Sequence, residues 1–90
     1  MIVKTFVVYK TESDHARDVL TFLSDFTRQT GRTITDVDPD SRDGASMCRT
    51  YDIVEYPSIV AVDDNGVLQT IWRGLPLPTV SEVSYYASQS

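Results

Sequence analysis

Few side chains in this chain could carry out nucleophilic or redox chemistry at neutral pH, because its 90 residues include one cysteine and one histidine. A thiolate is a nucleophile and a metal ligand, and an imidazole is a base near neutral pH. The lone Cys48 cannot form an internal disulfide, and metal sites need more ligands of this kind than His15 supplies. We therefore expect His15 to be a solvated residue at a helix start, and we expect neither a metal nor a cofactor.

Ser13 and His15 are close enough in the sequence to be considered as a nucleophile and its base. That chemistry requires the imidazole within hydrogen-bonding reach of the hydroxyl, and a third group that orients the imidazole. Neighbouring residues at a helix start rarely meet in this geometry, and the sequence offers no third group. The Ser13 hydroxyl is better interpreted as a helix cap.

A group of aspartates at short intervals before Gly44 suggests a calcium loop, and its members are Asp36, Asp38, Asp40 and Asp43. An EF-hand loop needs glycine at its sixth position and glutamate at its twelfth. Counted from Asp36, these positions hold Ser41 and Met47, and Pro39 lies inside the loop. A turn followed by a helix N-terminus explains the same acids.

Composition and charge narrow the class of protein. The formal net charge of −5 disfavours nucleic-acid binding, because phosphates would be repelled. No apolar run approaches the ~20 residues needed to cross a bilayer, so no membrane partner is expected. The N-terminal residues lack the apolar core of a signal peptide, so we expect a cytoplasmic protein. The length suits a single domain over residues 1–90.

Apolar periodicity predicts a strand and then a helix in the first third of the chain. Residues 2–9 form a nearly continuous β-branched and aromatic run, which is typical of a strand buried on both faces. Thr11 and Ser13 are both candidate N-caps for the following helix. Gly31 can end that helix in a left-handed conformation. The positions that follow helical spacing and should face inward are Ala16, Val19, Leu20, Leu23 and Phe26.

The remaining elements are a second α/β unit, a hairpin and a last helix. We expect strands and helices over residues 32–37 (strand), about 42–52 (helix), 58–62 (strand), 67–72 (strand) and 80–87 (helix). Asn65-Gly66 between two apolar runs is a strong hairpin signal. The second hairpin strand alternates, which should place Gln69 and Ile71 on one face. Thr79 and Glu82 form a capping box for the last helix.

The element order β-α-β-α-β-β-α predicts an α/β fold, with a four-stranded mixed sheet flanked by helices. A ferredoxin-like βαββαβ fold is the main alternative. It would need a final strand in the segment where the sequence indicates a capped helix.

One stretch of the chain carries a distinctive series of motifs, in the order Tyr51-Asp52-Ile53, Pro57 before an apolar strand, Asn65-Gly66, and Gly74 before the last helix. This series resembles the C-terminal half of thioredoxin, and the order of elements along the chain is similar to that of a thioredoxin-like domain. The resemblance implies a cis Tyr56–Pro57 bond, although any X-Pro bond considered alone is cis in only about 5% of cases. It also implies that the Pro57 loop lies beside the N-terminus of the first helix.

The same resemblance locates the position at which thioredoxins carry their Cys-x-x-Cys pair, and here that position holds Ser13-Asp14-His15-Ala16. A serine hydroxyl is not ionised near pH 7 and forms no disulfide, so dithiol exchange is excluded at this position. Glu12 and Asp14 also lie at the positive end of the helix, where they disfavour a bound carboxylate or phosphate. We therefore expect a redox-inactive domain rather than an enzyme.

A protein- or peptide-binding module is the leading functional hypothesis. Proline has no N–H, and the adjoining backbone of Tyr56 is left free to pair with an extended peptide, as this surface does in the resembling family. The expected site residues are Tyr56, Pro57, Thr11, Glu12, Ser13 and Asp14, with Tyr9 and Tyr56 at the rim.

Three alternatives to this module stay open. Pro57 could serve only to shape the core. The chain could be an atypical thiol oxidoreductase that acts through Cys48, although the resemblance implies a sheet-facing helix position for Cys48, which suits a buried structural cysteine better. It could also be a structural subunit that dimerises through a sheet edge. The sequence names neither a partner nor an oligomeric state.

Overall fold

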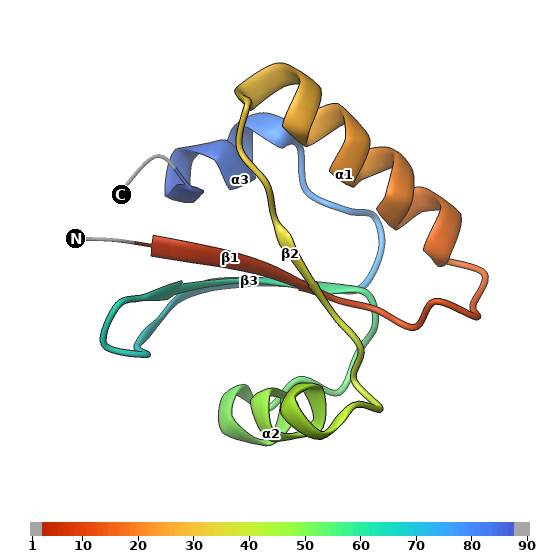
Figure 1. Cartoon of the computed structure of the whole chain (residues 1–90), viewed down its shortest axis with the longest axis vertical. Coiled ribbons are helices and arrows are strands. Elements are labelled where there is room, and N and C mark those ends of the chain that lie inside the picture. Colours follow the sequence, from red (N-terminus) through yellow and green to blue (C-terminus); the bar gives the residue numbers. More distant parts are fainter. Residues whose placement is uncertain (1–2, 88–90) are drawn as a thin grey trace.

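The chain forms a four-stranded sheet with helices on both faces (Figure 1). A computed structural model describes residues 3–87. The elements are β1 (Val3–Val8), α1 (Ala16–Thr30), β2 (Thr35–Val37), α2 (Arg42–Tyr51), β3 (Ser58–Asp63), β4 (Leu68–Arg73) and α3 (Val80–Ala87). The element order predicted from the sequence is confirmed. The ferredoxin-like alternative is wrong, because α3 occupies the segment where that fold needs its final strand.

The strands are arranged in the order β2-β1-β3-β4. β1 runs parallel to β2 and antiparallel to β3, and β4 is antiparallel to β3. Figure 1 shows α1 and α3 on one face of the sheet and α2 on the other. The chain therefore leaves the end of β1 toward one face and the end of β2 toward the opposite face. In open α/β sheets, a crevice forms between neighbouring strands whose connections diverge in this way.

Two hydrophobic cores lie on the two faces, and the central strands contribute to both. On β3, Ile59 packs in the core beneath α1 and α3, whereas Val60 packs in the core on the α2 side. Val7 and Val8 of β1 divide in the same way, and all four are 0% exposed. Successive side chains of a strand point to opposite faces, which explains the continuous apolar runs in these strands.

The buried face of α1 differs from the face predicted by its apolar spacing. Phe22 is buried together with Val19 and Phe26, whereas Leu20 is 56% exposed. Each residue advances about 100° around a helix, so Leu20 lies roughly 130° away from the centre of a face that is midway between Val19 and Phe22. The sequence spacing identified the amphipathic helix but placed the centre of its buried face incorrectly. Gly31 ends the helix with φ 72°, as predicted.

The strands at the two edges of the sheet also differ from the prediction. β2 is limited to three residues that pair with β1, rather than the predicted 32–37. β4 does not alternate strictly, because the register shifts between Ala61↔Thr70 and Val62↔Leu68 and leaves Gln69 as an extra, bulged residue. Leu68 and Ile71 consequently both pack against the α2-side core. The predicted start of the first strand at residue 2 lies outside the described residues.

Two findings bear on the function classes considered above. Within residues 3–87, no helix combines the length and the apolar character required to span a bilayer. The same part of the chain contains no group of three or more histidine, cysteine or acidic side chains arranged to hold a metal ion.

Candidate functional site

A cavity lies at the carboxyl ends of the parallel strands β1 and β2, between the loops that lead into α1 and α2. Its volume is about 390 Å³, and its lining residues are Lys10, Thr11, Glu12, Asp38 and Asp40. The carboxyl edge of a sheet, at strands whose connections leave to opposite faces, is the usual position of a ligand site in α/β folds. The fold therefore places two loops with polar and charged side chains against one another at this edge.

The loop before α1 is held by its own backbone and side chains. The backbone N–H of Lys10 donates to Nε2 of His15 at 3.2 Å, and the Ser13 hydroxyl donates to the carbonyl of Lys10. The His15 ring also packs edge-on against Tyr9, with ring centroids 6.4 Å apart. His15 lies at the helix start as expected, but it is half-buried and bound to the loop rather than fully solvated.

The same contacts show which residue begins α1 and whether Ser13 and His15 can act as a pair. The N-cap of α1 is His15, which makes no side-chain cap bond. The prediction that Thr11 or Ser13 caps this helix is therefore wrong. The lone pair of His15 Nε2 and the Ser13 hydroxyl proton are both used in bonds to Lys10. The two side chains therefore do not form a nucleophile and base pair, because each is bonded to Lys10 and there is no hydrogen bond between Ser13 and His15.

The loop before β3 carries a cis Tyr56–Pro57 peptide bond and lies beside the loop that precedes α1. The carbonyl of Pro57 accepts a 2.8 Å hydrogen bond from the N–H of Gly74. By contrast, neither the N–H nor the carbonyl of Tyr56 has a hydrogen-bond partner within residues 3–87. The Lys10 ammonium lies 5.5 Å from the centroid of the Tyr56 ring. The structure therefore brings the Tyr56–Pro57 loop and the loop before α1 together.

A second hollow continues the site beyond Gly74. It is a groove of about 550 Å³, lined by Asp18 of α1 and by Leu75, Pro76 and Leu77 of the connector to α3. Sequence reasoning did not identify this groove, because it forms between a helix and a connector that are far apart in the sequence. Pro76 and Pro78 indicate a stiff connector in the sequence, but they do not indicate that this connector lies against α1.

Cys48 lies on α2 close to the Tyr56 hydroxyl. Its Sγ is 4.0 Å from the Tyr56 hydroxyl, and its side chain packs against the α2-side core. It is partly exposed, and it is the sole cysteine in the sequence. Disulfide chemistry at this thiol would need a second thiol from another molecule.

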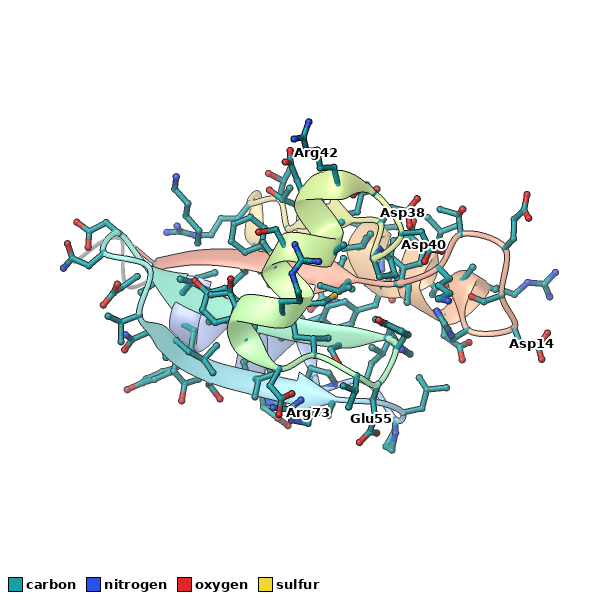
Figure 2. The ribbon with its side chains drawn as sticks, turned by 90° about the horizontal axis from the view of Figure 1, so that it is seen from below. Asp14, Asp38, Asp40, Arg42, Glu55 and Arg73 are labelled. Atoms are coloured by element: carbon teal, nitrogen blue, oxygen red, sulfur yellow. The ribbon has the colours of Figure 1, made fainter. Side chains whose placement is uncertain are left out.

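The predicted site residues take different places in the structure. Thr11 and Glu12 line the cavity, whereas Asp14 lies at the exposed tip of the loop (Figure 2). Tyr9 is only 4% exposed and belongs to the core, so its ring supports the loop rather than forming part of the rim. The sequence explains Asp38 and Asp40 by a turn or a calcium loop, whereas in the structure they form the α2 side of the cavity.

Burial raises the pKa of the Tyr56 hydroxyl above its ordinary value of 10.0, and the contact with Cys48 raises this pKa further. Burial and the Asp36 carboxylate likewise raise the pKa of Tyr9. The folded state thus holds these protons more tightly than the unfolded chain. Their contribution to stability should be complete below about pH 10 and should decline as the pH rises above it. Urea unfolding at a series of alkaline pH values should show this decline, and Tyr56→Phe should make it shallower.

No protein-family model and no curated protein sequence matches this chain. Many solved structures match its fold. A thioredoxin-2 described as a component of malaria parasite protein secretion machinery matches with a TM-score of 0.73 at 12% identity, over 99% of this chain and 84% of its own. Thioredoxin O2 from Arabidopsis thaliana matches with a TM-score of 0.69 at 13% identity, over 98% and 74% of the two chains.

The reduced thioredoxin pre-protein of Schistosoma mansoni matches with a TM-score of 0.71 at 15% identity, over 98% of this chain and 78% of its own. At such identities the similarity establishes the arrangement of the backbone and says nothing about activity. The matches span nearly the whole chain, from β1 to α3. The chain therefore has a thioredoxin-like fold, and its single cysteine means that it carries no Cys-x-x-Cys pair.

Proposed function

We propose that this chain is a non-catalytic module that binds an extended peptide segment of another protein at the Tyr56–Pro57 loop. The observation that carries the proposal is the unpaired backbone of Tyr56, whose N–H and carbonyl have no partner within residues 3–87. An extended segment can satisfy both groups by adding main-chain hydrogen bonds, which is the general mode of β-strand addition. Unpaired backbone groups otherwise depend on water for their hydrogen bonds.

The surroundings of Tyr56 support the same proposal. Pro57 is buried, and its carbonyl is fixed by Gly74, so the peptide group next to the unpaired one is held in place. Two hollows adjoin the loop. The cavity at Asp40 is lined by Lys10, which contacts the Tyr56 ring, and the groove at Leu75 follows Gly74, which is bonded to Pro57. Alternate side chains of an extended segment can enter such hollows while its backbone pairs between them.

The test is selection from a random-peptide display library with the folded chain as bait. Peptides recovered by the wild-type chain should bind Tyr56→Ala about tenfold more weakly or worse, because a rigid aromatic anchor is lost. The matched control is Tyr85→Ala, since Tyr85 is 64% exposed on α3 and lies outside the site. Its affinity should equal that of the wild-type chain.

A scan of N-methylated versions of one recovered peptide tests the main-chain pairing directly. Methylation removes an N–H donor, so binding should be lost at alternate positions and kept at the positions between them. Failure to enrich any peptide would contradict the proposed function. Equal losses in the two tyrosine variants would place the binding surface elsewhere.

A further inference from the structure

The charges around the Tyr56–Pro57 loop are strongly unbalanced. Six carboxylates belong to the two cavity loops and the loop before Pro57, and they are Glu12, Asp14, Asp38, Asp40, Asp52 and Glu55. Figure 2 shows the labelled members toward the end of the molecule where β1 leads into α1, whereas Arg42 is at the start of α2 and Arg73, which pairs with Ser58, lies near Glu55. The one cation of the cavity lining is Lys10. This face therefore carries an excess of negative charge.

Lys10 shows how the face accommodates a cation. Its ammonium lies over the Tyr56 ring, 5.5 Å from the centroid, and 3.9 Å from Oδ2 of Asp40. An aromatic ring combined with a carboxylate is an effective receptor for an ammonium or guanidinium group. The contact between Lys10 and Asp40 is open to solvent, because the Lys10 side chain is 45% exposed and the Asp40 side chain is 74% exposed. Exposed pairs of this kind contribute little stability, so Lys10 can be displaced at small cost.

The other acids of this face have no such partner. None of Glu12, Asp14 or Glu55 forms an ion pair within residues 3–87. Asp38 uses one carboxylate oxygen to accept the backbone N–H of Asp40, and its other oxygen is left for a ligand. An incoming cation would therefore meet several uncompensated carboxylates around the cavity. An acidic segment would instead be repelled from the face.

We infer that the segment bound at this face is basic, and that one of its lysine or arginine side chains enters the cavity and replaces Lys10 over the Tyr56 ring. This inference rests on the proposed peptide-binding function and adds the chemistry of the partner. The incoming cation takes the carboxylate of Asp40 and the free oxygen of Asp38. The chain's own lysine then acts as a competing placeholder that moves into solvent when the partner binds.

If the partner's cation replaces Lys10, then removing the Lys10 ammonium should strengthen binding rather than weaken it. Lys10→Met removes the competitor and leaves the acids in place, so it should strengthen the binding of a lysine-containing peptide about three- to tenfold. Lys4→Met is the matched control, because Lys4 is exposed and pairs with Val62 toward the opposite end of β1. The control makes the same change of charge and should leave the affinity within about twofold.

The probes are three synthetic forms of one peptide recovered by display, with lysine, glutamine or glutamate at the same position. The wild-type chain should bind the lysine form about three- to tenfold more tightly than the glutamine form, and the glutamate form most weakly. Raising the salt concentration should reduce these differences. Asp40→Asn should weaken the lysine form alone, whereas Asp64→Asn, in the exposed β3–β4 turn, should not. Circular dichroism and thermal unfolding of each variant would show that it is folded.

The outcomes separate this inference from the function on which it rests. If peptides are recovered but lack basic residues, or if Lys10→Met and Lys4→Met behave alike, the inference fails and the peptide-binding function stands. If no peptide is recovered, the proposed function itself fails. Self-association detected by light scattering and abolished by Tyr56→Ala would assign the face to a second copy of the chain, and would also overturn the inference.

Discussion

Gly44→Ala is expected to lower the free energy of unfolding by about 3 kcal/mol, because the helix α2 lies directly against the loop that precedes it. An ideal Cβ at this position would overlap the carbonyl oxygen of Asp38 and would lie 2.8 Å from Oγ of Ser41. The Asp38 carbonyl belongs to the backbone, so a side-chain rotation cannot relieve its overlap with the new Cβ. In an unobstructed helix the same substitution would instead stabilise by about 1 kcal/mol.

Urea unfolding of Gly44→Ala measures this effect, and Ser46→Ala in the same helix is the control. Ser46 is exposed, so its replacement should change the stability by less than about 0.5 kcal/mol. The loop pressed against Gly44 also contributes Asp38 and Asp40 to the cavity, so peptide binding should weaken as well. A Gly44→Ala chain as stable as the wild type would mean that the loop does not pack on α2 as described.

Ser13→Cys combined with Ala16→Cys is expected to give this chain, which has no Cys-x-x-Cys pair, the activity of a disulfide reductase. The N–H of Ala16 donates to the carbonyl of Ser13 at 3.3 Å, which closes a four-residue turn. The Cα atoms at the ends of such a turn lie within about 7 Å, and a disulfide spans about 4.4–6.8 Å. The N-terminus of α1 should also stabilise a thiolate at this position, which makes it a nucleophile.

Insulin reduction by dithiothreitol measures the new activity, and a Cys48→Ala background removes the native thiol from the assay. The double variant should accelerate the reaction, whereas Ser13→Cys alone and the parent chain should not. Mass spectrometry in oxidised glutathione should show the intramolecular disulfide in the folded protein. A pair that stays reduced under these conditions would show that residues 13–16 do not occupy the position of the Cys-x-x-Cys pair.

The order of the elements could be predicted from the sequence because each one depends on local signals. Continuous apolar runs identified β1 and β3, Asn65-Gly66 identified the hairpin, and Gly31 identified the end of α1. The incorrect predictions depended on tertiary contacts. The burial of Phe22 in place of Leu20 follows from where the sheet meets α1, and the bulge at Gln69 follows from pairing with β3. Neither contact has a signature in a single segment.

Part of the candidate site could also be predicted, because its two segments carry recognisable sequence motifs. The resemblance to thioredoxin pointed to the Tyr56–Pro57 loop and to the start of α1, and contacts of Lys10 bring these two segments together. The importance of Lys10 could not be predicted, because its partners His15, Asp40 and Tyr56 come from three separate loops. Side chains that assemble across loops become visible only when the fold is known.

The bulge in β4 has a consequence for how copies of this molecule behave in concentrated solution. β4 is a sheet edge of six residues, and an open edge of that length could recruit the strand of a neighbouring molecule and begin a fibrous aggregate. Gln69 interrupts the edge, and its amide is anchored to the Asp63 carboxylate at 3.1 Å. Deleting Gln69 would straighten the strand, so the shortened chain should lose solubility on storage even where its stability is little changed.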